Sequence, residues 1–572
     1  MSSGLGARGR AALALPLLAA LLGTAPPLRA QVVTDPTDPL YSDLEVWEAQ
    51  GLLPRLPALQ PYPVQMVRHF LHTVENSSLA EPSERARARW LLAQLDEPLR
   101  LTLHLDERFE HGSGGPYARF SIDPTLQGMV TPWLGGAARY QVMVLRLDDG
   151  LALPPYAPNP EDLIYDDVHF DVAGQTLHVR QMSHGSFGVG DGDGSLLFQL
   201  GLGRHRAGPF WHNGVVVGQQ APQAGQFSLL MRQPWFTAHI ALYELSATDD
   251  QGLGSATGKH LHLHSLDFHL APWLDLGIFE SVVYGGRFEL LYFIPMVAYF
   301  NSQGMTGFSD NSLVGLNGRV SPTPGLDLKG VLYVDDISFN DMASGNFDTK
   351  YKVAVQVGAS LSPASILDSV APGAMPWVQR HFIRLVSVDY TAVTPYTFTH
   401  ENTADGPYNW ESYTHAGQSF GPALAPNSDR VAVRALVRPL ADPQSTLDVD
   451  LDAAFIRHGN ASAGIIPGGD GSIHDPGWLG DEPTFQPPFE DPTGQPATRF
   501  LSQRMLEETL QLGMGATWTF DTAEDDAGTG ERAWGVWCVR ARYLQQWRAN
   551  ADFVPNQRGS SAFAELSLAW RY

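Results

Sequence analysis

Cysteine is almost absent from the 572-residue chain, which has a single residue of this type. Cys538 alone excludes intramolecular disulfides and any metal centre built from several thiolates. Charged residues are also scarce, at 17% of the chain, and the formal net charge is −24. Nucleic-acid binding needs a basic surface, and disorder needs high charge density with few aromatics, yet aromatics make up 10% here. The composition excludes both classes, so no nucleic-acid partner is predicted.

Long hydrophobic runs are missing beyond the N-terminus. The longest, residues 290–300, has 11 residues and contains Pro295, whereas a membrane-spanning helix needs about 20. Residues 1–30 differ, because Arg8 and Arg10 precede an apolar stretch at 11–22 and small residues follow it. This order is typical of a secretory signal peptide. We therefore expect export, and any membrane crossing must use strands.

Residues 31–98 carry a helical pattern. Val64, Val67, Leu71 and Val74 recur at spacings of three and four after Pro63, which is tolerated at the start of a helix. Similar spacing precedes and follows this stretch. The pattern predicts a small helical module that ends near Pro98.

Residues 99–572 alternate with a period of two. In one stretch Leu510, Leu512, Met514, Ala516 and Trp518 alternate with Thr509, Gln511, Gly513, Gly515 and Thr517. A soluble sandwich would alternate in the same way. Strands of about ten residues, aromatics near strand ends, and tight turns such as 322–325 beside long loops at 392–428 and 459–498 favour an apolar exterior. The predicted fold is therefore all-β, a transmembrane antiparallel β-barrel of about 18 strands.

The last nine residues, 564–572, place apolar or aromatic side chains at alternate positions up to Tyr572. This arrangement resembles the terminal strand of bacterial outer-membrane barrels. It favours the same fold and a location in the bacterial outer membrane.

Several stretches resemble the capsule-assembly Wzi family of outer-membrane proteins. They are 43–47 with 51–53 in the helical module, Leu200–Arg204, the run from 264 to 336 with Tyr292-Phe293-Ile294-Pro295, and 413–422. The resemblance implies an 18-stranded barrel with a periplasmic helical part. It further implies a protein that helps to retain capsular polysaccharide at the cell surface and has no enzymatic activity.

Two long loops carry the candidate polysaccharide-binding residues, which are aromatic and interleaved with Asp, Asn and Gly. They are Tyr396, Tyr408, Trp410 and Tyr413 in the first loop, and Trp478 and Phe485 in the second. Sugar rings have apolar C–H faces that stack on aromatic rings, while carboxylates and amides bind the hydroxyls. The alternative is that these side chains pack among themselves within the loops.

Other candidate chemistry has a structural explanation. His260, His262 and His264 share one strand face and could bind zinc or copper, but uncoordinated lumen histidines are the simpler expectation, so no metal or cofactor is predicted. Arg434 and Arg438 precede a turn that Asp448, Asp450 and Asp452 follow, which predicts a ladder of ion pairs across a hairpin in the lumen rather than a selectivity filter. Residues 417–421 fit the nucleophile-elbow pattern without the helix that it requires, so no catalytic residue is predicted.

Three functions remain open from the sequence. The first is an outer-membrane barrel that binds or organises surface polysaccharide, with outer-membrane lipid and the glycan as partners. The second is a diffusion porin for small solutes, which the polar inner faces favour. The third is a scaffold whose helical module contacts the cell wall or another periplasmic partner, because residues 43–51 also resemble surface-layer homology repeats.

Overall fold

A computed structural model describes residues 29–30, 36, 38–95, 99–111, 117–131, 134–146, 168–172, 175–190, 195–248, 255–294, 298–307, 310–337, 343–344, 351–370, 382–395, 397–399, 408–442, 445–459, 500–501, 505–521 and 535–571. Within these ranges, no helix has both the length and the apolar character needed to cross a membrane. The predicted signal peptide lies outside the described residues, apart from 29–30.

Three helices form the predicted N-terminal module. They are α2 (Leu40–Ala49), α3 (Val64–Glu75) and α4 (Pro82–Leu95). Val67, Phe70 and Leu71 of α3 are fully buried against Leu44 and Trp47 of α2. Nine residues of α2 are buried, including its acidic ones. A helix that is buried on every side must have neighbours all around it.

The barrel wall is one antiparallel sheet. In the described residues the sheet has 20 strands, of which the short β1 (Arg29–Ala30) and β6 (Val168–Val172) are additions, and the other 18 form a closed ring. The strands of the ring are β3 (Leu99–His111), β4 (Tyr117–Thr131), β5 (Leu134–Arg146), β7 (Gln175–Gly190), β8 (Leu196–Gly203), β10 (Ala224–Gln233), β11 (Phe236–Thr248), β12 (Ser255–Ala271), β13 (Leu274–Gly285), β14 (Asn311–Thr323), β15 (Leu326–Ile337), β16 (Tyr351–Leu361), β17 (Ile383–Val393), β20 (Ser428–Asp442), β21 (Ser445–Gly459), β22 (Leu506–Asp521), β23 (Val536–Ala549) and β24 (Arg558–Arg571). Closure comes from the pairing of β24 with β3, which confirms both the predicted terminal strand and the predicted fold.

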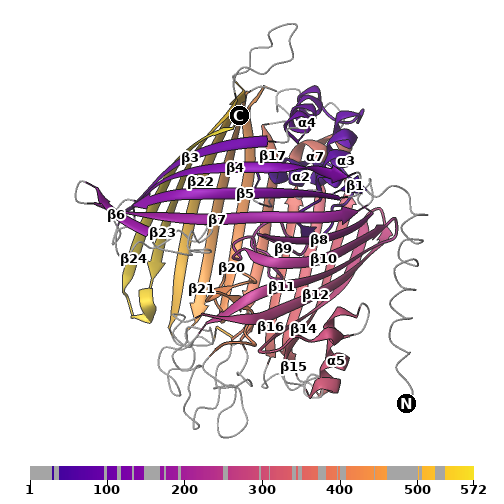
Figure 1. Cartoon of the computed structure of the whole chain (residues 1–572), viewed down its shortest axis with the longest axis vertical. Helices are drawn as coiled ribbons and strands as arrows, with labels where there is room; N and C mark the ends of the chain where they lie inside the picture. The colour runs from indigo at the N-terminus through magenta and orange to yellow at the C-terminus, as the bar shows by residue number, and fades with distance from the viewer. Residues whose placement is uncertain are drawn as a thin grey trace, which may run out of the picture.

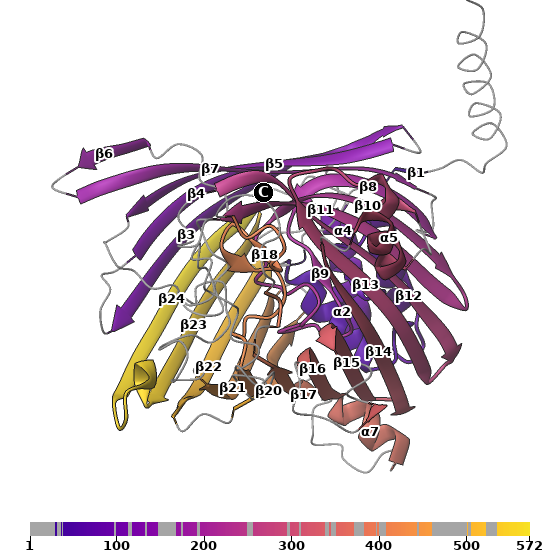
Figure 2. The same cartoon turned by 90° about the horizontal axis from the view of Figure 1, so that it is seen from below.

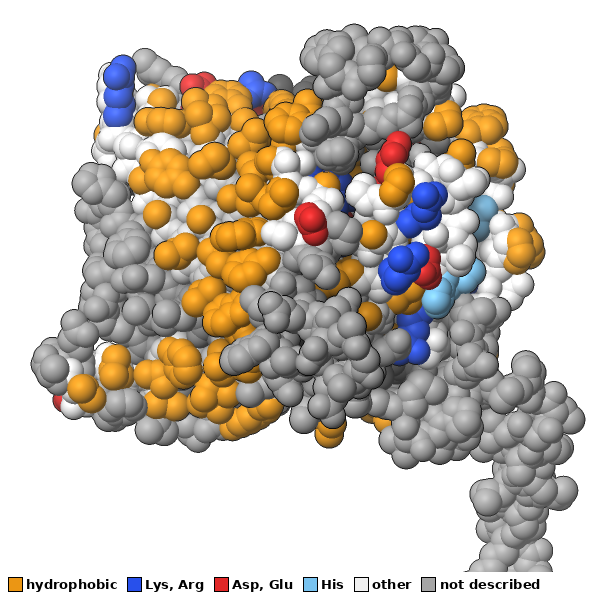
Figure 3. All heavy atoms as spheres, turned by 90° about the horizontal axis from the view of Figure 1, so that it is seen from above, with side chains coloured by type: hydrophobic (Ala, Val, Ile, Leu, Met, Phe, Trp, Pro, Cys, Tyr) orange, Lys and Arg blue, Asp and Glu red, His pale blue; other side chains and the backbone are white. Residues whose placement is uncertain are grey.

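The outer face of the barrel is apolar. On β22, Leu510, Leu512 and Met514 are exposed, while Thr509 and Gln511 on the other face are buried or half-buried. Figure 3 shows hydrophobic side chains spread over a wide area of one face, with few charged side chains among them. An exposed apolar surface of this extent requires a nonpolar solvent, so the apolar faces of these strands are suited to lipid.

The two ends of the barrel differ. At one end, the turn end, two residues connect strand pairs such as β14 and β15, where Gly325 adopts a φ of +87°. The opposite end, the loop end, carries the 3₁₀ helix η1 (Leu290–Phe293), α5 (Tyr299–Thr306) and the long connection from β17 to β20. Figure 1 shows the three helices of the module and α7 (Pro363–Val370) near the turn end, and Figure 2 shows α2 inside the ring of strands.

The prediction of lumen histidines is wrong. On β12, Leu261 and Leu263 face inward and belong to the buried core inside the barrel. His260, His262 and His264 therefore face outward, because adjacent strand residues point to opposite sides. Period-two alternation does not determine which face points inward. Here the apolar face points inward because it packs against the apolar core that fills the lumen. In the described part of the chain, no group of three or more His, Cys, Asp or Glu side chains is placed to hold a metal ion.

The outward and inward faces of β22 give a matched test of membrane orientation. We expect Leu512→Arg, near the middle of the strand, to lower the free energy of unfolding in phospholipid vesicles by about 2–4 kcal/mol. Gln511→Arg, on the adjacent inward position, should lower it much less. Urea titration of vesicle-folded protein measures both values, and equal losses would contradict the assignment of the faces.

Candidate functional site

A plug fills much of the lumen and is the candidate functional site. It consists of the helical module (38–95), the connection between β8 and β10 (204–223) and residues 408–427. Residues 204–223 fold inward, where β9 (Arg206–Ala207) pairs with β2 (Leu59–Gln60) of the module. On its other side this connection meets residues 408–427, because the Gly218 N–H donates to the Phe420 carbonyl (3.0 Å). The plug is thus continuous from the turn end toward the loop end.

An apolar core joins the plug to the wall. Val216 and Val217 pack with Tyr413 and Phe420 of the plug and with wall residues such as Tyr243. The Tyr413 hydroxyl donates to the Val216 carbonyl (2.8 Å), so this buried group is satisfied. Glycine is required at 218, where a Cβ would lie 2.1 Å from the Gly421 carbonyl oxygen.

His415 fixes residues 408–427 against the wall. Its Nδ1 accepts from the Ser246 N–H (2.9 Å), and its Nε2 lies 3.0 Å from the Gln223 carbonyl. One acceptor and one donor nitrogen describe a neutral imidazole. Burial lowers the pKa of His415 to about 4, so it stays neutral at physiological pH.

The acidic face of α2 is held by arginines. Asp43 lies 2.9 Å from Arg384 of β17, 2.8 Å from Arg438 of β20 and 3.0 Å from Arg87 of α4. Burial alone raises the pKa of Asp43, but the guanidinium groups of Arg438, Arg87 and Arg384 together hold it far below its usual range. A buried carboxylate with three cationic partners locks the helix to the wall.

Two more carboxylates extend this contact along α2. Glu45 lies 3.1 Å from both Arg434 of β20 and His212 of the plug. Burial raises the pKa of Glu45, but His212 and then Arg434 outweigh it and bring the pKa to about 2. Glu48 pairs with Arg319 of β14 and accepts from the Trp211 indole N–H (3.1 Å). All three acidic side chains of α2 therefore have partners.

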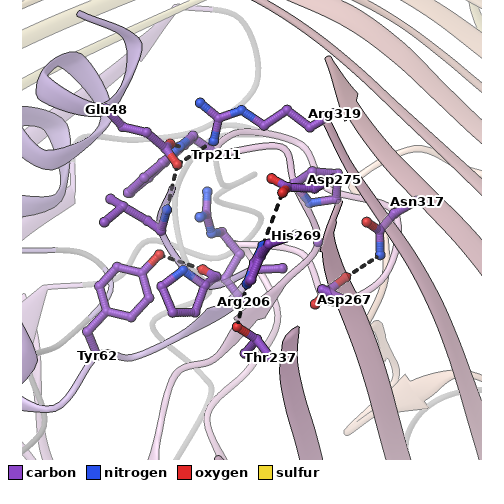
Figure 4. A pocket seen from close by; sticks show the side chains of 15 residues that line it. Glu48, Tyr62, Arg206, Trp211, Thr237, Asp267, His269, Asp275, Asn317 and Arg319 are labelled. Carbon is purple, nitrogen blue, oxygen red and sulfur yellow. Dashed lines mark hydrogen bonds and ion pairs between the residues drawn. The ribbon is translucent and has the colours of Figure 1, made fainter. Parts of the chain in front are cut away.

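The plug leaves little room beside Glu48. The pocket in Figure 4 encloses about 50 Å³ between the module and the inner faces of β11 to β14. Several of its polar groups are paired with each other, as Asn317 is with Asp267 (3.0 Å) and His269 is with Asp275 (3.0 Å). This volume holds very few water molecules.

A larger cavity lies on the other side of the module. It measures about 370 Å³ and lies between α4 and the inner faces of β4, β5, β7, β8 and β22 to β24. Trp90, Arg139, His184, Gln199 and Arg540 are among its lining residues. A cavity of this size can hold a small molecule.

The predicted ion-pair ladder across β20 and β21 is confirmed. Arg434 lies 2.5 Å from Asp450, and Arg438 lies 2.6 Å from Asp448. A third pair joins Asp452 to Arg542 of β23 (3.7 Å). The sequence did not reveal that Arg434 and Arg438 also bind α2. The available signal was the set of carboxylates on an otherwise apolar helix, because such groups need partners when buried.

The predicted glycan-binding residues are only partly described. Tyr396, Trp478 and Phe485 lie outside the described residues. Tyr413 is fully buried in the plug core, Trp410 is almost fully buried, and Tyr408 is half-buried. The rings of Tyr408 and Trp410 lie side by side, with centroids 5.7 Å apart. A glycan role for the six residues stays a prediction.

Comparisons with known proteins bear on the fold. No protein-family model and no curated protein matches the chain. Among solved structures, "Wzi, an outer membrane protein involved in group 1 capsule assembly in Escherichia coli", described as a carbohydrate-binding β-barrel, is 13% identical, with a TM-score of 0.53. The match covers 94% of this chain and 98% of that one. The chain shares the fold of Wzi.

Two further solved barrels match with lower scores. OprD of Pseudomonas aeruginosa is 9% identical, covers 83% of this chain and 93% of its own, and has a TM-score of 0.41. OccAB2 of Acinetobacter baumannii is 10% identical, covers 83% of this chain and 97% of its own, and has a TM-score of 0.42. The likeness to Wzi spans nearly all of both chains, so the barrel and helical module implied by the sequence resemblance are confirmed.

Neutralising Asp43 tests the arginine contacts. Asp43→Asn removes the carboxylate that pairs with Arg87 and one of the two carboxylates beside each of Arg384 and Arg438. Losing one partner of a buried ion pair costs about 3–5 kcal/mol. We expect the module to be released and trypsin to cleave it at least tenfold faster in the folded protein. Glu75→Gln, which removes an exposed pair with Arg89, is the control and should cost about 0–1 kcal/mol. Equal cleavage of the two variants would contradict the account.

The depressed pKa values also predict how module docking depends on pH. Because the pKa of Glu45 falls from 4.5 to about 2 on folding, its stabilisation is complete above pH 4.5 and is lost as the pH falls toward 2. Asp43 shifts in the same direction. Amide hydrogen exchange, corrected for intrinsic rates, should show α2 losing protection over this range, and Glu45→Gln should flatten the change. A pH-independent protection factor in α2 would refute this prediction.

Proposed function

We propose that the chain is a bacterial outer-membrane β-barrel that binds or organises polysaccharide at the cell surface. The likeness to Wzi over 94% of the chain carries the proposal. Wzi is described as carbohydrate-binding and as involved in capsule assembly. The apolar exterior supports placement in a membrane, and the module at the turn end would then face the periplasm.

The filled lumen also supports binding rather than bulk transport. The plug is held by a buried apolar core and by charge-paired carboxylates, so residues 408–427 are fixed relative to the wall. Asn409 illustrates this, because its side chain accepts from the Thr248 N–H (3.0 Å) and donates to the Thr248 hydroxyl (2.9 Å). A rigid segment presents its aromatic rings with little loss of entropy on binding.

Tyr408 is the best-placed candidate for contact with a glycan. It is half-buried next to Trp410, which packs so closely on β13 that a Cβ at Gly285 would lie 2.2 Å from its ring. Trp410 therefore packs behind Tyr408, which is only half-buried. Stacking on such a ring would orient a sugar, and the neighbouring loops would bind its hydroxyls.

The binding role of Tyr408 can be measured with purified protein and surface polysaccharide. Loss of one stacking ring costs about 0.5–1.5 kcal/mol, so Tyr408→Ala should weaken binding roughly two- to tenfold in calorimetric titration. Tyr543→Ala, which removes an exposed ring on the outer wall, is the matched control and should leave binding unchanged. Absence of polysaccharide binding by the unmodified protein would contradict the proposed function.

A diffusion porin is the second candidate, and the cavity of about 370 Å³ beside α4 favours it. Liposomes that contain the protein distinguish the two functions through their swelling in monosaccharide solutions. Because the plug occupies the lumen, we expect swelling no faster than that of empty liposomes. Swelling at a rate comparable to that of a general porin would favour the channel function instead.

A further inference from the structure

A strip of polar side chains faces outward from the part of the wall nearer the loop end. On β12 these are His260, His262 and His264, which pair in register with Tyr284, Val282 and Glu280 of β13. A tilted strand crosses the bilayer in about 9–11 residues. Counted from the turn at Leu274, that distance reaches Tyr284. The strip therefore lies within the stretch of β13 that would cross the membrane.

The connection from β13 to β14 covers this strip from outside the barrel. Its described residues are 286–294, 298–307 and 310, which we call the outer segment. The Tyr299 ring stacks on His264 with centroids 4.1 Å apart, and the Tyr299 N–H donates to Glu280 (2.7 Å). The Phe293 ring meets His262 edge-on at 4.7 Å. His262 is fully buried as a result.

Hydrogen bonds also fix some of the polar groups beneath the outer segment. His262 Nε2 lies 3.0 Å from the Tyr284 hydroxyl. The Tyr292 hydroxyl donates to Asp310 (2.5 Å), which also pairs with Arg287 (2.5 Å). Tyr284, Tyr292 and Tyr299 form a buried cluster with Val282. The contact has the packing of a protein interior although it lies outside the wall.

The opposite face of the outer segment is apolar and exposed. Leu290 is 69% exposed and Met305 is 77% exposed, while Phe288, Ile294 and Phe300 are exposed as well. This surface continues into the apolar exterior, because Ile278 of β13 and Leu316 of β14 are exposed on the same side of the wall. Figure 1 shows α5 at the loop end, and its contacts are with β13 and η1.

We propose that the outer segment is a lipid-contacting cover, with Leu290, Phe300 and Met305 in contact with acyl chains of the outer leaflet. It converts a wall strip carrying three histidines and a glutamate into an apolar surface. Continuity with the exposed apolar side chains of β13 and β14 identifies lipid as the occupant. The inference rests on the proposed membrane location, in which the loop end faces the cell surface.

Site-directed spin labelling tests the cover in the full-length protein in proteoliposomes. A Cys538→Ser background receives single cysteines at Phe300 and Met305. Leu316→Cys on β14 is the control for lipid exposure. Leu79→Cys in the helical module is the control for an apolar residue exposed to water, since Leu79 is 80% exposed. Heat-modifiable gel migration confirms that each labelled variant is folded.

Collision with molecular oxygen, which concentrates in lipid, is compared with collision with a water-soluble nickel chelate. We expect the oxygen-to-nickel ratio at positions 300 and 305 to match that at 316 and to exceed that at 79 at least threefold. Ratios equal to that at 79 would overturn the inference while leaving the membrane location intact. Exclusion of both reagents would also overturn it, in favour of a second copy of the chain. A water-like ratio at 316 itself would overturn the membrane location as well.

Discussion

The burial of three carboxylates on one short helix is the constraint on which the closed lumen depends. Asp43, Glu45 and Glu48 cannot be taken out of water without cations beside them. Strands β14, β17 and β20 supply those cations through Arg319, Arg384, Arg434 and Arg438. The helical module is thereby attached to three separate strands of the wall. Because residues 204–223 pair with the module and contact residues 408–427, the position of α2 also determines where these two segments of the plug lie.

A filled lumen changes which face of a strand is apolar. Along β22 the apolar side chains face outward, as in a barrel with a polar interior. Along β12 the leucines face inward because the plug core packs on them, and the histidines face outward because the outer segment covers them. Each face of β12 therefore needs a covering element: the plug core covers the inward leucines, and the outer segment covers the outward histidines. The barrel thus has protein on both sides of its wall at β12 and β13.

Local patterns in the sequence predicted the strands, the helical module, the terminal strand and the ion pairs across one hairpin, because each depends on residues that are close in the chain. The orientation of His260, His262 and His264 depends on what packs against each face, and alternation carries no such information. Two of the three arginine partners of Asp43, Arg384 and Arg438, lie 341 and 395 residues away, so only the tertiary fold brings them together with it. The burial of Tyr413 has the same origin, since its hydroxyl partner is at Val216, 197 residues distant.

A double-mutant cycle between Asp43 and Arg438 tests most directly whether charge pairing holds the plug in place. The cycle compares Asp43→Asn, Arg438→Gln and the double variant, with the free energy of module release taken from amide hydrogen exchange in α2. The account predicts that the double variant is destabilised less than the sum of the single variants, with a coupling of about 2–3 kcal/mol. Additive losses, within about 0.5 kcal/mol, would contradict the central claim.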